Sequence, residues 1–453
     1  MLVKYLFFLF CTLSLMGFGD ASYANAALAG PQPRPGSTGQ TVHPARPLSP
    51  PTPINPTPEN PAGPLSLQKA LSLGLLQNPE LAAFSWEIRS AEARAVQAGL
   101  FPNPELETIV ENFGGKNDQS GFKNAETTVQ VNQTIELGGK RLKRKQVANL
   151  ETDLATWDFE SKRLDVFADI SGAFWDVFTA QESLSITREL AKLSEATYAT
   201  VVERVKAGKV PPVEALQANV SLTTARIELE QARYTLEAAR KRLAATWGSA
   251  DPAFEAVTGR MDLITPLPEL AELEKGIIKN PDVARWTTEI ENKSAAVTLK
   301  DAEAIPDVTV GAGPRYSNET NDTAFVMALS VPIPLFNRNQ GQRQEARHGL
   351  SKAKEEQRAA ILKARSTLGQ AYQELSAAFL SASSFREIAM PAAETAFKST
   401  LEGYREGKFS YPLVLEAQRT LFEVRRQHLL SLREYHKARA GIERLTGQPL
   451  TVK

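Results

Sequence analysis

Cysteine and histidine, the side chains of thiol enzymes and of most zinc sites, are scarce in this chain of 453 residues. It holds one cysteine, Cys11, and four histidines, without a CxxC, an HExxH or any zinc-ligand spacing. His428 and His436 lie about 12 Å apart along a helix, which is too far for them to share one ion. We therefore predict neither a metalloenzyme nor a thiol enzyme. Surface or packing roles are expected for His348, His428, His436, Met261, Met327 and Met390.

Other patterns that could carry chemistry are also weak. Gly311-Ala312-Gly313 resembles the start of a dinucleotide-binding loop, but it lacks the third glycine and lies in a strand-like segment. No nucleophile, acid–base pair or metal cluster has a usable spacing. The 52 basic and 52 acidic side chains give zero formal net charge, which argues against nucleic-acid binding. The sequence predicts no enzyme, no catalytic residue, no cofactor, no bound metal and no nucleic-acid partner.

One strongly basic run, Lys140 to Lys145, lies where a strand-like segment passes into a helical one. Two interpretations remain open at this point. The cations could lie near anionic head groups at a membrane surface, or they could belong to a solvated helix start.

The first 26 residues have the composition of an export signal. Lys4 precedes a short apolar segment, Leu6 to Met16, and Ala24-Asn25-Ala26 offers a small-x-small cleavage site. Cys11 lies inside the apolar segment. We therefore expect it to be removed with the signal, without lipidation.

A proline-rich linker is predicted over residues 27–64. Residues 31–64 hold 12 of the 28 prolines, which predicts an extended tether without helix or sheet. Beyond it, the longest apolar run, Ala324 to Phe336, has 13 residues and two prolines, too short for a membrane helix. An exported chain of this kind is periplasmic, secreted, or placed in the outer membrane as strands.

Short motifs recur about 200 residues apart, which indicates an internal duplication. Asn78-Pro79-Glu80-Leu81 returns as Asn280-Pro281-Asp282-Val283, and Gly208-Lys209 returns as Gly407-Lys408. The two expected copies of the unit cover residues 65–248 and 249–453.

Each copy should contain a helical stretch (66–100; 268–304), two strands, a very long helix, a tight turn and a returning helix. No proline occurs between Pro104 and Pro211, which predicts one helix from about 139 to 206, roughly 100 Å long. Its counterpart should run from about 338 to 406, with a kink at Pro391. In the first returning helix, small residues alternate with leucine at coiled-coil spacing. This seam comprises Leu222, Ala225, Leu229, Ala232, Leu236, Ala239 and Leu243.

Four segments have the period-two alternation of strands, at about 104–113, 126–137, 306–316 and 324–333. The second alternates polar and less polar residues over about 12 positions, enough to cross a bilayer as a tilted strand. The alternative is a soluble pair of hairpins with one buried face. The export signal favours the membrane interpretation.

Four strands would leave two open edges, which a bilayer does not tolerate, so several chains must associate. A dimer would supply eight strands, which form a barrel whose interior side chains fill. A trimer would supply 12 strands and leave room for a channel. The helical hairpins would continue this cylinder into the periplasm. Their tips, residues 206–212 and 406–412, would lie about 100 Å below the membrane.

Taken together, these motifs resemble those of the TolC-type outer-membrane efflux proteins, in particular the branch that serves heavy-metal (cobalt-zinc-cadmium type) resistance-nodulation-division pumps. The resemblance runs from Leu65 to Gly447. The motifs that carry it are Gln133-x-Ile135-Glu136-Leu137-Gly138-Gly139-Lys140-Arg141, Pro332-Ile333-Pro334-Leu335-Phe336-Asn337-Arg338-Asn339-Gln340-Gly341, Gly208-Lys209-Val210-Pro211 and Gly407-Lys408-Phe409-Ser410.

The resemblance implies a mainly α fold with a small β part. Long helical hairpins would form a periplasmic tunnel, and four strands per chain would contribute to a 12-stranded barrel in a homotrimer. The implied partners are a periplasmic adaptor (membrane-fusion protein), an inner-membrane pump of the resistance-nodulation-division class, and outer-membrane lipid. The family often carries an acylated N-terminal cysteine, and this sequence departs from that pattern.

Two groups of site residues follow from the resemblance. The residues expected at the tips, for adaptor docking or gating, are Arg204, Lys206, Gly208, Lys209, Pro211, Tyr404, Arg405, Glu406, Gly407, Lys408 and Ser410. The residues expected at the membrane-interface junctions are Gly138, Gly139, Lys140, Arg141, Asn337, Arg338 and Gly341.

The sequence therefore predicts an outer-membrane channel subunit of a tripartite efflux pump. It would be a passive conduit from periplasm to exterior, for heavy-metal cations. The alternatives are a periplasmic coiled-coil adaptor or scaffold without a pore, and the same channel serving organic drugs.

Overall fold

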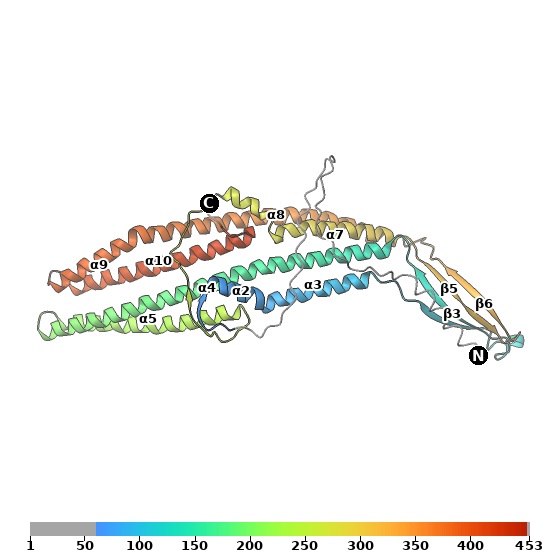
Figure 1. The fold of residues 1–453 in the computed structure, drawn as a ribbon, viewed down its shortest axis with the longest axis horizontal. Helices are drawn as coiled ribbons and strands as arrows, with labels where there is room; N and C mark the ends of the chain where they lie inside the picture. The colour runs from blue at the N-terminus through green and yellow to red at the C-terminus, as the bar shows by residue number, and fades with distance from the viewer. Residues whose placement is uncertain (1–59, 451–453) are drawn as a thin grey trace, which may run out of the picture. The chain divides into compact units, whose positions relative to one another are not determined.

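The computed structural model describes residues 60–450, all within one compact unit, and this part of the chain is mainly helical (Figure 1). The predicted signal peptide, Cys11 and nearly all of the predicted linker lie outside the described residues. Among residues 60–450, no helix combines the length and apolar character needed to cross a membrane.

The same order of elements occurs twice along the chain. The first half contains β1 (Gly63–Ser66), α2 (Leu67–Gln77), α3 (Pro79–Ala98), β2 (Glu105–Glu111), the 3-10 turn η1 (Asn117–Gln119), β3 (Glu126–Ile135), α4 (Lys140–Lys206) and α5 (Pro212–Ala245). The second half contains β4 (Phe254–Thr258), α6 (Leu270–Ile277), α7 (Pro281–Glu303), β5 (Val308–Ser317), β6 (Asp322–Ser330), α8 (Gln340–Ser384), η2 (Phe385–Ala389), α9 (Met390–Arg405) and α10 (Tyr411–Thr446).

The predicted long helix is confirmed as α4, which has 67 residues and is roughly 100 Å long. Its counterpart is interrupted at the expected place, because a π-helical turn, η2, separates α8 from α9. Pro391 lies in the first turn of α9, where it lacks the N–H that a continuous helix would use. The first hairpin therefore contains one unbroken long helix, α4, whereas the second contains a π-helical turn between α8 and α9.

The recurring Asn-Pro motif has a structural role at the start of α3 and α7. The Asn78 side-chain oxygen accepts the Leu81 N–H at 2.9 Å, and its amide donates to the Thr246 carbonyl at the end of α5 at 2.8 Å. Asn280 likewise accepts the Asp282 N–H and donates to the Arg444 carbonyl. Each asparagine thus caps one helix and ties it to the end of the returning helix.

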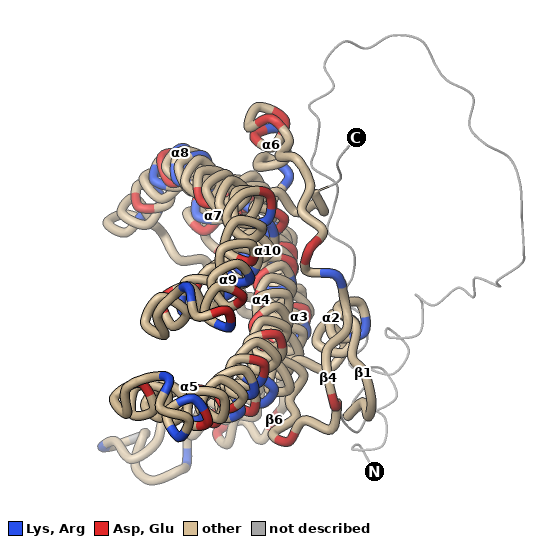
Figure 2. Tube along the Cα trace, turned by 90° about the vertical axis from the view of Figure 1, so that its left-hand side faces the viewer, with Lys and Arg blue, Asp and Glu red and all other residues tan. Residues whose placement is uncertain are grey.

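Helix α4 contacts both α5 and α10, and acidic and basic residues are interspersed along the helices (Figure 2). α3 and α5 follow one another along α4, so two shorter helices line the long one (Figure 1). The predicted seam of α5 is buried or half-buried throughout, as its spacing requires.

Trp247, just after α5, anchors the largest core cluster and is fully buried beside Phe254. We expect Trp247→Ala to lower the free energy of unfolding by about 4 kcal/mol, because it empties a large part of this core. Trp86→Ala is the matched control: Trp86 is 58% exposed on α3, and its loss should cost less than about 1 kcal/mol. Urea unfolding followed by circular dichroism measures both, and equal losses would contradict this packing.

The sequence did not predict β1 and β4, which form a short parallel pair. β1 begins at Gly63, so the last two residues of the predicted linker belong to a sheet, contrary to the prediction that the linker contains none. Proline is tolerated here because Pro64 lies in a two-stranded edge.

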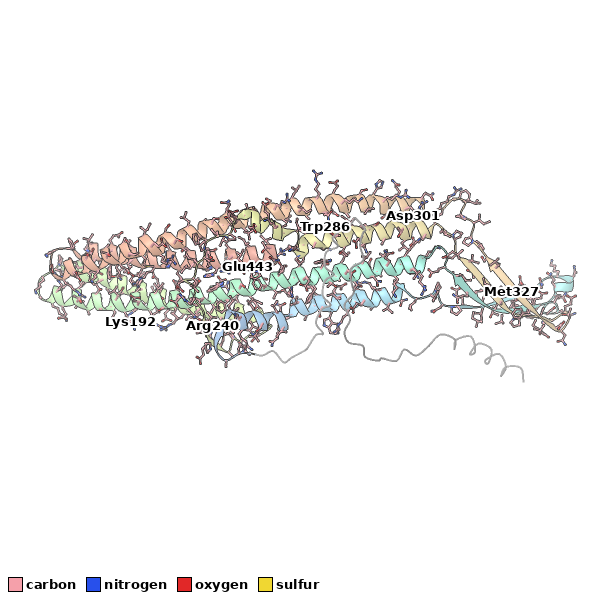
Figure 3. The ribbon with its side chains drawn as sticks, turned by 45° about the horizontal axis from the view of Figure 1, so that its top comes forward. Lys192, Arg240, Trp286, Asp301, Met327 and Glu443 are labelled. Carbon is pink, nitrogen blue, oxygen red and sulfur yellow. The ribbon has the colours of Figure 1, made fainter. Side chains whose placement is uncertain are left out.

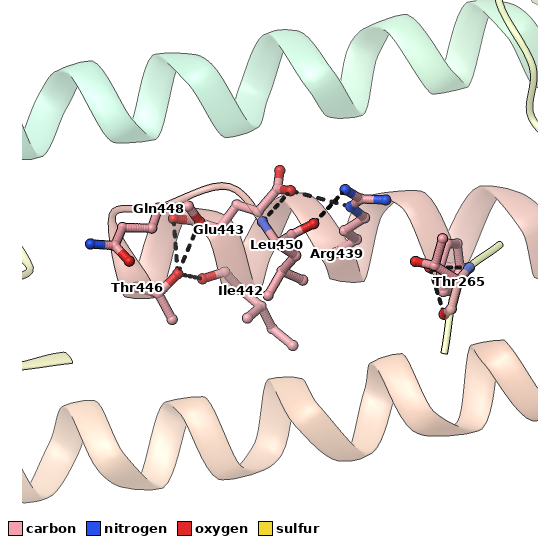
Figure 4. A network of polar contacts seen from close by, with 8 residues as sticks. Thr265, Arg439, Ile442, Glu443, Thr446, Gln448 and Leu450 are labelled. Carbon is pink, nitrogen blue, oxygen red and sulfur yellow. Dashed lines mark hydrogen bonds and ion pairs between the residues drawn. The ribbon is translucent and has the colours of Figure 1, made fainter. Parts of the chain in front are cut away.

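Polar contacts hold the residues that follow α10 against that helix (Figure 4). Gly447, with φ +67°, ends α10 in the left-handed conformation. The Leu450 N–H donates to Glu443 at 2.9 Å, and Arg439 donates both to Glu443 and to the Leu450 carbonyl. The chain beyond the last helix is thus fixed as far as Leu450.

Candidate functional site

A four-stranded antiparallel sheet adjoins the start of α4, with strand order β2-β3-β5-β6. Two local hairpins form it, and β3 pairs with β5 between them, so residues almost 200 positions apart become neighbours. β2 and β6 are the free edges. The β3–β5 register aligns Thr134 with Thr309 and Glu126 with Ser317.

The register gathers apolar side chains on one face of the sheet. On β6, Phe325, Met327 and Leu329 are each more than 70% exposed, and Met327 projects from the strand in Figure 3. No described residue covers this face at these positions, although burying such side chains is strongly favourable. By register the face comprises Leu106, Thr108, Val110, Thr127, Val129, Val131, Gln133, Ile135, Val308, Val310, Ala312, Pro314, Tyr316, Thr323, Phe325, Met327 and Leu329.

The opposite face is polar and acidic. Its charged residues are five carboxylates and one guanidinium, a formal surplus of four negative charges. They are Glu105, Glu107, Glu111, Glu126, Asp322 and Arg315. Gln130 and Asn132 on β3 both donate to Glu107, at 2.7 and 2.8 Å, so the face is also tied together across strands.

Arg315 on β5 is the single cation of this acidic face. It donates to the Thr128 hydroxyl at 2.9 Å and to Glu126 at 3.1 Å, and it lies 3.6 Å from Glu111. These contacts join β5 to both β3 and β2. Sequence alternation identified the strands, but it could not indicate which acids this arginine meets.

The strands are shorter than predicted at several ends. β2 covers 105–111, within the predicted 104–113, and β3 ends at Ile135 instead of 137. β6 covers 322–330, so the predicted extension to 333 is wrong. Pro332 and Pro334 lack the N–H that a continued ladder requires, which explains this end. Residues 331–338 instead form an exposed segment with Ile333, Leu335 and Phe336 on its surface.

Both predicted junctions lie where the sheet passes into a long helix. Gly138 and Gly139 have φ near +70° before α4, and Asn339 has φ +59° before α8. A side chain on Gly138 would also meet Ile305, so glycine is required there for space as well as conformation. Asn337, Arg338 and Gly341 are exposed at the second junction.

Most side chains of the basic run, Lys140 to Lys145, bind other residues of the chain. Neither a position near lipid head groups nor a solvated helix start predicts these contacts. Lys140, nearly buried, binds Asp307 at 2.7 Å. Arg141 lies over the Phe101 ring and donates to the Gly99 carbonyl, and Arg144 binds Glu136. The run therefore joins α4 to the end of α3 and to the sheet. A second such link is made by Asp301 of α7, which binds Arg343 and Arg347 of α8 (Figure 3).

Asp307 accepts both the Lys140 ammonium and the Leu137 N–H, so we expect Asp307→Ala to destabilise the junction. An unpaired, nearly buried ammonium should cost about 3 kcal/mol in unfolding free energy. Asp262→Ala is the control, because Asp262 pairs with Arg260 at an exposed position, where such pairs contribute little. Urea unfolding of the detergent-extracted protein measures both. Equal stability of the two variants would contradict a structural role for Asp307.

The two hairpin tips have the same backbone geometry. At the first, Gly208 has φ +68° and the Lys209 N–H donates to the Arg204 carbonyl. At the second, Gly407 has φ +75° and the Lys408 N–H donates to the Gly403 carbonyl. Glycine in this conformation ends each helix and allows the chain to reverse. Both tips lie at the end of α4 away from the sheet (Figure 1).

A contact between two of the predicted tip residues, whose pairing the sequence could not assign, connects the two tips. Arg204 donates to the Tyr404 carbonyl at 2.9 Å, and its guanidinium lies 4.3 Å from the centre of the Tyr404 ring. Tyr404 is buried with Val201, Ala218, Tyr411 and Val414, and burial raises the pKa of both tyrosines. The sequence prediction missed Tyr411, as well as Glu214, which lies 3.5 Å from the Tyr404 hydroxyl.

The remaining predicted tip residues face outward. Lys206 pairs with Glu203 and Glu406 with Lys408, each within its own hairpin. The exposed tip surface comprises Lys206, Gly208, Lys209, Pro211, Arg405, Glu406, Gly407, Lys408 and Ser410. The tips thus present a mixed-charge surface, with the Arg204–Tyr404 contact behind it.

The histidines have packing roles where the structure buries them. His436 stacks on Trp175 at 4.0 Å and contacts the Met261 carbonyl through Nε2 at 2.9 Å. Burial lowers the pKa of His436, so the neutral ring is favoured. Within residues 60–450, no cluster of three or more His, Cys, Asp or Glu side chains could hold a metal ion.

Comparisons with known proteins agree with this arrangement. A family model described as "Outer membrane efflux protein" matches residues 70–249 and 273–448. Cobalt-zinc-cadmium resistance protein CzcC of Cupriavidus metallidurans is 35% identical over 393 residues, or 86% of this chain and 92% of that protein. Nickel and cobalt resistance protein CnrC of the same organism is 31% identical over 293 residues, covering 64% and 67%. The structure of outer membrane protein VceC from Vibrio cholerae matches with TM-score 0.66 and 19% identity, covering 84% of this chain and 96% of that one.

Proposed function

The chain belongs to the outer membrane efflux protein family, and from this premise we propose that three copies form a passive conduit from periplasm to exterior. The observation that carries the proposal is the two-faced sheet with two free edges. An uncovered apolar face suits contact with lipid, and an acidic face suits contact with water and ions.

The free edges of β2 and β6 support closure by other copies of the chain, since a bilayer cannot satisfy their backbone groups. Each chain supplies four strands to the sheet. Three chains would give 12 strands, wide enough for an open lumen, whereas two would give a barrel filled by side chains. The helical hairpins would then continue the conduit as a tunnel into the periplasm.

We propose heavy-metal cations as cargo. The names of two relatives refer to resistance to cobalt, zinc, cadmium and nickel. The acidic face also favours a positively charged cargo, because its surplus carboxylates attract cations and repel anions along the wall. A conduit needs only weak contacts with its cargo. Selection among the metals then belongs to a pump upstream. The competing proposal is that the same channel exports organic drugs.

The exposed tips are the surface that we propose for docking a periplasmic adaptor, through which an inner-membrane pump delivers cargo and energy. The tips lie at the end of α4 farthest from the sheet, about 100 Å along the helix. Their mixed charges suit a complementary polar surface. A charge reversal at Lys209 and Lys408 should weaken adaptor binding without changing the amount of channel in the membrane.

The cargo proposal predicts cation selectivity that depends on the acidic face. Glu105→Gln combined with Asp322→Asn removes two of five carboxylates, and the cation-to-anion permeability ratio should fall about twofold. The control is Glu269→Gln with Glu274→Gln, at exposed positions on or beside α6. Reversal potentials across a salt gradient measure both, and an anion-selective wild type would overturn the assignment.

Cargo is tested directly in cells that lack this chain. Restoring it should lower the cellular content of zinc, cobalt or cadmium and raise the tolerated concentration of the metal. Restored tolerance to organic drugs without any change in metal content would identify the competing cargo. Restoration of neither, by a protein that forms channels, would overturn both cargo assignments.

A further inference from the structure

The loop that joins β2 to β3, residues 112–125, is ordered by its own hydrogen bonds. The Gly114 N–H donates to the Gly121 carbonyl at 2.9 Å, and the Gly115 N–H donates to the Gln119 carbonyl at 2.8 Å. Asn318, in the other loop, donates to the Phe122 carbonyl at 2.8 Å. The loop thus continues the hairpin at the end of the sheet away from the helices, and the neighbouring loop holds it in place.

This loop presents two aromatic rings to solvent. Phe113 and Phe122 stack at 5.6 Å with an interplanar angle of 3°. They are nevertheless 51% and 66% exposed, so each ring covers part of the other and no described residue covers the rest. Such a pair on a soluble surface is unfavourable, whereas aromatic rings are favoured where strands leave a bilayer. Tyr316 and Phe325, on the apolar face, lie toward the same end of the sheet.

Two lysines lie in the same loop. Lys116 and Lys123 are exposed, and neither has a carboxylate within ion-pair distance among the described side chains. Glu111 and Glu126, the acids at the base of the hairpin, are both engaged with Arg315. The 112–125 loop contains two lysines and one acidic residue, Asp118, a formal charge of +1, whereas the other loop carries Glu319 and Asp322 and no cation. The positive charge at this end is therefore greater on the loop that carries the two rings.

We propose that Phe113, Phe122, Lys116 and Lys123 form a binding surface for the phosphate groups of an anionic glycolipid in the outer leaflet of the outer membrane. The inference rests on the proposed function, which places the helices in the periplasm and this loop outside. The loop with the rings follows the end of the sheet where the apolar face carries Tyr316 and Phe325, and the ammonium groups would meet the lipid phosphates there. Continuity with the apolar face is what selects a lipid over a soluble anion.

The test uses the full-length, detergent-extracted oligomer and two probes, diphosphorylated lipid A and its dephosphorylated form. The phosphorylated lipid should bind the wild type at least tenfold more tightly than the dephosphorylated one. Lys116→Gln with Lys123→Gln should remove about tenfold or more of that preference, since each cation near an anionic lipid contributes measurably. The control, Lys354→Gln with Lys363→Gln, removes two exposed cations from α8 and should change nothing.

A second variant and a second measurement separate the possible failures. Phe113→Ser with Phe122→Ser should weaken binding of both lipid forms while leaving single-channel conductance in neutral phospholipid unchanged. A conductance change without a change in lipid binding would place the rings in the lumen and overturn the proposal. An unaltered phosphate preference in the lysine variant would also overturn it. Channel formation in neutral bilayers reports the proposed function alone, so a lipid result cannot be mistaken for its failure.

Discussion

Gly313→Val should abolish assembly of the folded sheet. A Cβ on Gly313 would lie 1.9 Å from the Val129 carbonyl oxygen and 2.5 Å from the Gln130 Cα, so the obstacle is the backbone of the adjacent strand. No side-chain rotation relieves such a contact, and β3 would have to separate from β5 where the two halves of the chain meet. We expect a loss of more than about 4 kcal/mol, in the range of severe core disruption.

Two other glycines calibrate this effect. At Gly311 the nearest obstacle is the Asn132 side chain at 2.2 Å, which can move, so Gly311→Val should be less damaging. Gly349 on α8 has nothing within 4 Å, so Gly349→Val serves as the matched control. The measurement is the amount of heat-modifiable oligomer in the outer-membrane fraction. Normal levels of the Gly313 variant would show that β3 and β5 do not pair as described.

Arg204→Ala should open the conduit at its periplasmic end. Arg204 is the predicted tip residue that links the first hairpin to the second, through the Tyr404 carbonyl and ring. One hydrogen bond from a charged group and one cation–π contact together contribute about 2 kcal/mol. Losing that stabilisation shifts a closed-to-open equilibrium about thirtyfold. Single-channel recordings should therefore show a much larger fraction of time in the open state.

Variants at the same tips separate this contact from a general effect of charge. Tyr404→Phe keeps the ring and the carbonyl and removes the hydroxyl, which lies 3.5 Å from Glu214, so its effect should be small. Lys206→Ala should also have little effect, because Lys206 pairs with Glu203 on its own helix. If Lys206→Ala opens the channel as much as Arg204→Ala does, the Arg204–Tyr404 contact is not what keeps the periplasmic end closed.

The long helices could be predicted because prolines, or their absence, indicate where a helix is disturbed. The absence of proline between Pro104 and Pro211 predicted α4 to within one residue, and Pro391 predicted a kink close to η2, the π-helical turn between α8 and α9. These signals are local, since a missing N–H or an absent breaker acts on its own segment. The four strands of the larger sheet could be predicted from their period-two alternation, which is also local, although β2 and β3 are shorter than predicted and Pro332 ends β6 early.

Contacts between distant segments could not be predicted. β1 has four residues and gains its pairing from β4, about 190 positions later, so no local pattern marks it. The β3–β5 pairing and the partners of Arg315 likewise depend on register across the two halves. The sequence could not show that Lys140 forms a nearly buried ion pair, because its partner, Asp307, lies 167 positions later. The sequence showed that the Asn-Pro motif recurs. It could not show that each asparagine also bonds to a carbonyl at the end of α5 or α10, because those residues are distant in sequence.

The central claim, a conduit made of three chains, is tested most directly by planar-bilayer conductance with the oligomer mass determined on the same detergent-extracted sample. The account predicts discrete channels from a species of three chains, with cations passing more readily than anions. A water-soluble monomer without conductance would contradict it and leave the uncovered apolar face of the sheet without an explanation.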